Sequence, residues 1–192
     1  MNVILASTSP YRKTLLQRLG IPFTCENPGV DEDQYKSLGL EPAVLAQKLA
    51  YEKAHAVHLR HPNSLVIGGD QLGEVDGTIL GKPGTAEKAL VQLQLMRGKT
   101  HRLLTAVHLL GPQIDIPHLA VTRLHMRQLT DDELRAYIKL DQAFDCAGSY
   151  KIEQHGIKLF NEIQCDDMNT IMGLPLIWLQ TALLKAGVSF FP

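Results

Sequence analysis

Three hydroxyl-bearing residues stand immediately before a predicted helix near the amino end of the chain. Ser7-Thr8-Ser9 follows the apolar run at 3–6 and precedes Pro10, and Arg12 lies about one turn inside the helix. The first amide groups of a helix have no partner within it and carry the positive end of its dipole, so this arrangement favours binding of a phosphate group. Serines also cap ordinary helices, and that alternative stays open at this point.

Carboxylates and lysines elsewhere in the chain could complete such a site. They are the acidic run at 31–33, which includes Glu32, then Asp70 after two glycines, and Lys53 and Lys82. Carboxylates beside phosphate favour a hard divalent ion, and lysines would neutralise a polyphosphate. An acidic run is also typical of a solvated loop, and lysines are mostly exposed. Asp70 is the strongest candidate, because we expect it at the end of a buried strand, where open α/β sheets bind ligands.

Other catalytic patterns are missing. The sequence has no GxxxxGK[ST] or GxGxxG phosphate loop and no GxSxG serine motif. A histidine recurs every three residues at His55, His58 and His61. The series extends past the end of a predicted helix and has no carboxylate motif beside it, so we discount a metal site there. Trp178 lies among aliphatic residues and is expected in the core.

Length, charge and cysteine content narrow the class of protein. The chain has 192 residues and a formal net charge of -1, so we expect one domain over 1–192 with no general attraction to nucleic acid or membranes. The amino end lacks a signal-peptide pattern, which favours a cytoplasmic location. The three cysteines are widely spaced, so we expect reduced and mostly buried thiols; they are Cys25, Cys146 and Cys165.

Strand and helix patterns alternate along the chain. Strands are expected at 3–6, 64–67, 103–110, 119–127 and 157–163, and helices at 10–19, 41–58, 85–97, 130–140 and 173–186. Ser9, Gly20 and the Thr130/Glu133 pair are typical helix-capping residues, and Asp76-Gly77 predicts a tight hairpin. Together these elements predict an α/β fold with a mixed sheet and flanking helices.

Seven short segments form a recognisable series. They are ILASTSPYRKTLL near the amino end, VDE at 30–32, EKA at 52–54, GGDQ at 68–71, GKP at 81–83, CAGSYKIE at 146–153 and GLPL at 173–176. Their order and spacing resemble the Maf family of nucleoside triphosphate pyrophosphatases over essentially the whole chain. The resemblance implies two lobes around a central cleft, as in inosine triphosphate pyrophosphatases, and frequently a homodimer. It also implies hydrolysis of a nucleoside triphosphate to its monophosphate and diphosphate.

The resemblance also assigns roles to the candidate residues. Asp70 corresponds to the family's proton acceptor, and the polar cleft residues correspond to Ser7, Arg12, Glu32, Lys53 and Lys82. A divalent cation, Mg²⁺, Mn²⁺ or Co²⁺, would assist attack by water, with Glu32 and Asp70 as its candidate ligands. Whether Asp70 takes the proton itself or holds the metal stays open.

Three further positions concern the base. Pyrimidine-preferring members carry Arg, Thr and Gln where this chain has Tyr11, Gln71 and Glu153. The present combination resembles the subfamily that hydrolyses 7-methylguanosine triphosphate, with Tyr in place of its Trp. We therefore expect a 7-methyl-GTP pyrophosphatase. The alternatives are the same reaction on dTTP and UTP, and a nucleotide-binding regulator without turnover.

Overall fold

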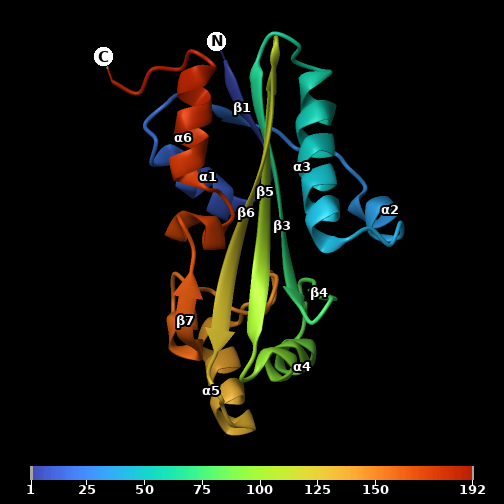
Figure 1. Cartoon of the computed structure of the whole chain (residues 1–192), viewed down its shortest axis with the longest axis vertical. Helices are drawn as coiled ribbons and strands as arrows, with labels where there is room; N and C mark the ends of the chain where they lie inside the picture. The colour runs from blue at the N-terminus through green and yellow to red at the C-terminus, as the bar shows by residue number, and fades with distance from the viewer. Residues whose placement is uncertain (1, 192) are drawn as a thin grey trace. The chain divides into compact units, whose positions relative to one another are not determined.

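The computed structural model describes residues 2–191, which divide into two compact units. The first unit comprises residues 2–70, 105–120 and 167–191, and the second comprises residues 71–104 and 121–166. Three long strands contribute residues to both units: β3 (Leu65–Val75), β5 (Thr100–Gly111) and β6 (Ile114–Met126) (Figure 1). The chain therefore passes between the units along continuous strands.

The strands form one mixed sheet. The four shorter ones are β1 (Val3–Ala6), β2 (Thr24–Cys25), β4 (Thr78–Leu80) and β7 (Phe160–Gln164). The strand order is β2-β1-β3-β5-β6-β7, with β4 paired to β3. β1 pairs in parallel with β2 and β3, whereas the β3–β4 and β6–β7 pairs are antiparallel. This confirms the predicted α/β class with a mixed sheet. The central cleft and the single domain over 1–192 stay predictions.

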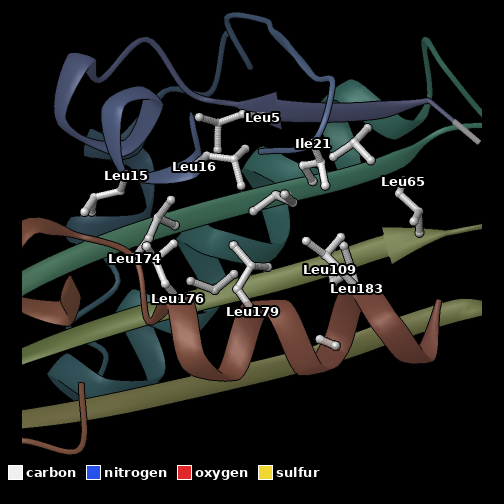
Figure 2. Close-up of a cluster of buried hydrophobic side chains, with 14 residues drawn as sticks. Leu5, Leu15, Leu16, Ile21, Leu65, Leu109, Leu174, Leu176, Leu179 and Leu183 are labelled. Atoms are coloured by element: carbon white, nitrogen blue, oxygen red, sulfur yellow. The ribbon is translucent and has the colours of Figure 1, made fainter. Parts of the chain in front are cut away.

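Helices cover both faces of the sheet in the first unit. On one face, Leu5 and Ile67 pack in a buried cluster with leucines of α1 (Pro10–Gln17) and α6 (Leu176–Lys185) (Figure 2). On the other face, Ile4 and Val66 pack with residues of α3 (Pro42–His58). Successive strand residues point to opposite faces, so the apolar runs of β1 and β3 supply both layers.

The glycine pair in β3 does not end the strand. We predicted a strand over 64–67 with Asp70 at its end, but β3 continues through Asp70 to Val75. Gly68 lies on the face that meets α3, and a Cβ there would stand 2.2 Å from the Ala50 carbonyl oxygen and 2.6 Å from the Ala54 amide nitrogen. Its role is therefore close helix packing rather than termination. β1 ends at Ala6, which pairs with Gly68, so Asp70 lies just beyond the carboxyl end of the neighbouring parallel strand.

Other boundaries also differ from expectation. β5 and β6 are longer than predicted. The short helix α2 (Glu32–Lys36) begins within the acidic run at 31–33, where we predicted no helix. The strand predicted at 157–163 begins as the 3₁₀ turn η1 (Gly156–Leu159). The last helix begins at Leu176, after the 3₁₀ turn η2 (Met168–Met172). The cysteines are not mostly buried: Cys25 is exposed, and Cys146 and Cys165 are half-buried.

Local capping signals agree with the structure. The Ser9 side chain accepts a hydrogen bond from the Arg12 amide at the start of α1. Thr130 and Glu133 form a capping box at the start of α5 (Asp131–Asp141), which contacts α4 (Ala86–Met96) in the second unit. Asp76 and Gly77 have φ angles of 49° and 80°, as a primed hairpin turn requires. Within residues 2–191, no helix combines the length and apolar character needed to cross a bilayer.

The packing at Gly68 gives a stability prediction. Gly68→Ala should lower the free energy of unfolding by about 1–3 kcal/mol, because the added methyl group would overlap backbone atoms of α3. Gly81→Ala is the matched control, since a Cβ at Gly81 meets no atom within 4 Å. Chemical denaturation of both variants would measure the difference. Equal stability of the two variants would contradict this account of the glycine.

Candidate active site

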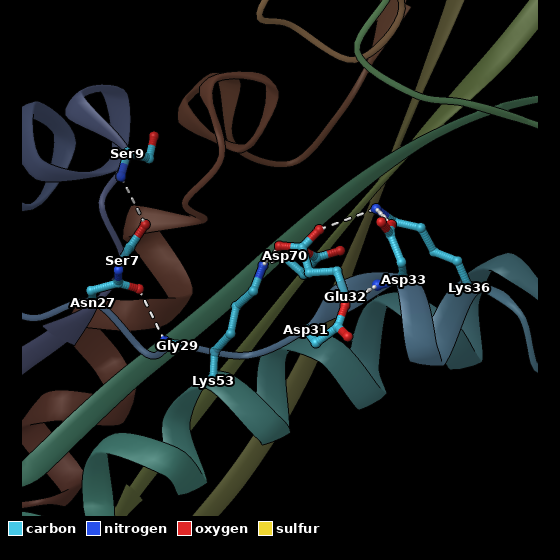
Figure 3. A network of polar contacts seen from close by, with 10 residues as sticks. All are labelled: Ser7, Ser9, Asn27, Gly29, Asp31, Glu32, Asp33, Lys36, Lys53 and Asp70. Atoms are coloured by element: carbon cyan, nitrogen blue, oxygen red, sulfur yellow. Dashed lines mark hydrogen bonds and ion pairs between the residues drawn. The ribbon is translucent and has the colours of Figure 1, made fainter.

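One buried lysine joins two carboxylates in the first unit. Lys53 Nζ lies 2.7 Å from Asp70 Oδ1 and 2.6 Å from Glu32 Oε1. Figure 3 shows Lys53 reaching from α3 toward Asp70 on β3, with Glu32 at the start of α2 beside them. The side chains of Lys53 and Asp70 are 9% and 7% exposed, so water screens their interaction weakly.

Each partner is positioned by a local feature of the sequence. Every second residue of β3 faces α3, and these residues include Val66, Gly68 and Asp70. Because Gly68 has no side chain, α3 lies close to the strand, and Lys53 reaches Asp70. Asp31 caps α2 by accepting a hydrogen bond from the Asp33 amide. This cap fixes the first turn of α2, from which the side chain of Glu32 extends to Lys53.

The charges in this group stabilise one another. Partial burial alone would raise the pKa of Glu32, but the hydrogen bond and charge of Lys53, together with Lys36, lower this pKa below its ordinary value. Lys36 Nζ lies 3.4 Å from Glu32 Oε2. Burial lowers the pKa of Arg12, and the negative charges of Asp70 and Glu32 oppose that shift. Arg12 stays protonated, because a guanidinium does not lose its proton in proteins.

The second oxygen of Asp70 has no hydrogen-bond partner. Asp70 Oδ2 is buried and unbonded within the described residues, although Oδ1 binds Lys53. An unsatisfied buried carboxylate oxygen costs about 1–3 kcal/mol or more, so such an atom calls for an explanation. The oxygen is available to accept a proton from a bound water or to bind a cation. Both are functions of a reactive carboxylate.

The serine turn and Arg12 form the other side of the group. Ser7 is buried, and its Oγ accepts a hydrogen bond of 3.1 Å from the Ser9 amide. Arg12 Nε donates to the Gly173 carbonyl oxygen at 3.2 Å. That bond fixes the arginine through Nε and leaves its two Nη groups without a hydrogen bond to any described residue. Paired Nη groups suit the bidentate binding of phosphate oxygens.

The comparison with known families decides the relationship. A family model described as Maf-like protein matches residues 2–186. The chain belongs to the Maf family.

Relatives in this family are similar over nearly their full length. A protein of Bdellovibrio bacteriovorus is 46% identical over 97% of each chain, and one of Xanthomonas oryzae is 46% identical over 96% of each chain. A third, from Polaromonas, is 44% identical and is matched over 98% of this chain and 86% of its own length. All three are named 7-methyl-GTP pyrophosphatase.

The structure places the predicted Maf site residues in two groups. Arg12, Glu32, Lys53 and Asp70 interact within the first unit, which also holds Ser7 and the half-buried Tyr11. The second unit carries the half-buried Gln71, directly after Asp70 on β3, and the exposed Lys82 and Glu153. The participation of this second group in the same site stays a prediction.

Sequence reasoning missed some of the residues that shape the site. Lys36 could have been found, because it lies four residues after Glu32 on a helix face. Gly173, whose φ is 113°, gave no local signal of its contact with Arg12.

The donor set fits a cation that binds together with its substrate. Within residues 2–191, no group of three or more His, Cys, Asp or Glu side chains could hold a metal ion. Glu32 and Asp70 provide two carboxylates, and one oxygen of Asp70 is unbonded. Mg²⁺ is commonly held by one or two carboxylates with substrate phosphates and water as its remaining ligands. The residues therefore fit a phosphate-dependent metal site rather than a preformed cage.

The lysine bridge gives an electrostatic prediction. Lys53→Met should raise the pKa of Glu32, because the hydrogen bond and charge that lower it would be removed. Carbon-13 NMR titration of the Glu32 carboxyl group would measure the change. Since this pKa is lowered in the folded state, ionised Glu32 stabilises the fold above its unfolded-state pKa. That contribution is lost as the pH falls through the folded-state value, and it should be smaller in the variant.

Lys48→Met provides the control for this titration. Lys48 is on the same helix and pairs with Glu52 instead of Glu32. The Glu32 pKa should be unchanged in Lys48→Met. A Glu32 pKa that is also unchanged in Lys53→Met would show that the lysine does not control this carboxylate.

Proposed function

We propose that this chain is a nucleoside triphosphate pyrophosphatase that hydrolyses 7-methyl-GTP to 7-methyl-GMP and diphosphate. The observation that carries the proposal is the unbonded Asp70 Oδ2 beside the cations Lys53 and Arg12, in a Maf family chain. The names of relatives at 44–46% identity support the reaction and its substrate. The reaction would remove a modified nucleotide from the nucleotide pool.

Hydrolysis of the triphosphate requires a general base for the attacking water and positive charges that neutralise the leaving diphosphate. Water attacks the α-phosphorus, a new P–O bond forms, the bond to the bridging oxygen breaks, and diphosphate leaves with the bonding electrons. Asp70 Oδ2 accepts the proton of the attacking water, while Lys53 holds the other carboxylate oxygen in place. Arg12 and Lys82 bind the phosphate oxygens, and Ser7 supplies a hydroxyl group beside the amino end of α1.

A divalent cation, Mg²⁺, Mn²⁺ or Co²⁺, completes the proposal. Glu32 would hold it, with Asp70 as a second ligand in the alternative in which Asp70 binds the metal instead of taking the proton, and it would supply Lewis acidity toward the phosphate groups. Lys53 fixes the carboxylates of both residues, so a cation or water bound between them and the triphosphate would have a defined position.

Base recognition rests on three side chains. Methylation at N7 makes guanine cationic, so the face of the Tyr11 ring would attract it. The Watson–Crick edge of guanine presents two adjacent donors, which the exposed Glu153 carboxylate could accept together. Gln71, next to Asp70 on β3, is the third specificity residue that we propose.

The cellular setting is part of the proposal. A single Maf domain over 1–192 would act as a homodimer in the cytoplasm, on free nucleotides rather than on nucleic acid. The near-neutral net charge of -1 supports a local anion site over general attraction to polyanions.

Turnover should depend on the Asp70 carboxylate. Asp70→Asn should lower diphosphate release by about 100-fold or more while nucleotide binding persists, because the general base is lost and the phosphate-binding cations remain. Asp115→Asn is the control, since Asp115 contacts His108 instead of Lys53. Diphosphate release would be measured over 7-methyl-GTP, GTP, dTTP and UTP with each metal. Preference for dTTP and UTP would favour the pyrimidine alternative, and binding without release by the wild type would favour the regulator.

The preference for the base should depend on Tyr11 and Glu153. Tyr11→Ala should lower the preference for 7-methyl-GTP over GTP by about threefold to thirtyfold, the range expected for a lost cation–π contact. Glu153→Gln should lower the preference for both guanine nucleotides over UTP by about tenfold or more. The ratios of kcat/KM would measure both effects, with Glu162→Gln as control because Glu162 is also exposed and pairs with Gln164. Unchanged ratios in both variants would refute these assignments.

A further inference from the structure

Glu153 lies on a short turn in the second unit, between residues that are tightly held. Its side chain is exposed and makes no hydrogen bond or ion pair with the described residues. The residues on either side differ from it: the Lys151 amide donates to the Tyr137 hydroxyl at 3.0 Å, and the His155 amide donates to Asp141 Oδ2 at 3.1 Å. The turn is therefore fixed at both ends while its carboxylate is left available.

The turn is closed tightly by its own backbone. The Lys151 carbonyl oxygen accepts hydrogen bonds from the Gln154 amide at 3.2 Å and from the Gly156 amide at 2.9 Å. A Cβ at Gly156 would stand 2.5 Å from that oxygen, so only glycine allows the closure. This closed turn fixes the backbone position from which the side chain of Glu153 extends.

One buried face of α5 contacts and supports the turn. Tyr137 and Asp141 are four residues apart on this helix, both are 5% exposed, and they therefore lie one above the other on the same face. Besides binding the His155 amide, Asp141 lies 2.5 Å from His155 Nδ1 through its other oxygen. Burial raises the pKa of Tyr137, so the phenol keeps its proton and can donate to Asp141 while it accepts from the Lys151 amide.

These contacts make Asp141 the common anchor of the turn. It receives the backbone and ring of His155 directly, and it receives Lys151 through Tyr137. A buried carboxylate that accepts several hydrogen bonds holds its donors more strongly than a neutral acceptor would. The carboxylate of Glu153 lies on the exposed side of this turn.

We propose that Asp141, with His155, is a positioning pair for base recognition that fixes the turn from which Glu153 reads the guanine edge. This inference rests on the proposed function, because it concerns how that function selects its substrate. It makes no demand on the chemical step, for which we propose Asp70 of the first unit as the base. The pair should therefore affect KM and base preference, and kcat should change little.

A double-mutant cycle tests this pair against a merely structural role. His155→Ala removes the ring contact from an exposed position, and Asp141→Asn removes the charge but keeps an acceptor. Each would be measured alone and combined with Glu153→Gln. His155→Ala should lower the kcat/KM preference for 7-methyl-GTP over UTP by about tenfold, mainly through KM, the scale of one charge-assisted hydrogen bond. In the Glu153→Gln background it should cause no further loss of preference.

His125→Ala is the matched control, because His125 is another imidazole of the second unit and contacts Thr100 instead. It should leave the preference unchanged. Equal losses from His155→Ala with and without Glu153, or no loss at all, would overturn the positioning role. Asp141→Asn should reproduce the selective loss in weaker form, and a fall in kcat without a change in preference would also contradict the proposal.

Binding measurements separate this inference from the proposed function. The affinities of α,β-methylene analogues of 7-methyl-GTP and UTP would be measured for the same variants, and turnover would be followed in parallel. Absence of turnover in the wild type would refute the pyrophosphatase proposal, while the affinity cycle would still test the turn. Turnover with an additive affinity cycle would refute the positioning pair alone. Failure of the wild type to bind either analogue would refute both.

Discussion

A single buried ammonium group, that of Lys53, holds two carboxylates from separate parts of the chain in one place. Without it, the charges of Glu32 and Asp70 would repel each other in a poorly hydrated setting, and one carboxylate would tend to become protonated. Removing one partner of a buried ion pair typically costs about 3–5 kcal/mol, because the remaining charge is left uncompensated. The bridge also uses only one oxygen of Asp70 and leaves the other unbonded, and this second oxygen is the one that we propose as the proton acceptor. Structure and proposed chemistry thus depend on the same contact.

The position of Lys53 depends in turn on how closely α3 approaches the sheet. Gly68 and the alanines of α3 allow backbone contact where any larger side chain would separate the layers. On the same face of β3, Asp70 follows Gly68 by two residues and lies past the end of β1, so its carboxylate is not covered by a neighbouring residue of that strand. On the opposite face, Gly69 leaves space for Arg12, whose Nε lies 3.4 Å from where a Cβ would be. The two adjacent glycines therefore leave room for α3, which carries Lys53, and for Arg12, which we propose as a phosphate-binding residue.

Local signals in the sequence predicted the elements better than their ends and their contacts. The caps at Ser9 and Thr130 and the turn at Asp76 were correct because each depends on residues only a few positions apart. The strand end before Asp70 was wrong because glycine weakens isolated strands, whereas here a packed helix requires the missing side chain. The meeting of Glu32, Lys53 and Asp70 follows no sequence periodicity. Their residue types indicated only that they could complete a phosphate site, and the family resemblance grouped them in one cleft. Nothing local indicated that Asp141 anchors the turn of Glu153, since that contact needs the completed fold.

The central claim is that the unbonded oxygen of Asp70 faces the nucleophile for the α-phosphorus. The most direct measurement is a crystal structure of the wild-type chain with the α,β-methylene analogue of 7-methyl-GTP and Mn²⁺. We expect a water within hydrogen-bond distance of Asp70 Oδ2, about 2.6–3.2 Å, lying opposite the bridging carbon at the α-phosphorus, with Lys53 still bound to Oδ1. A triphosphate bound away from Arg12 and Lys53, with Asp70 Oδ2 contacting neither water, metal nor nucleotide, would contradict it.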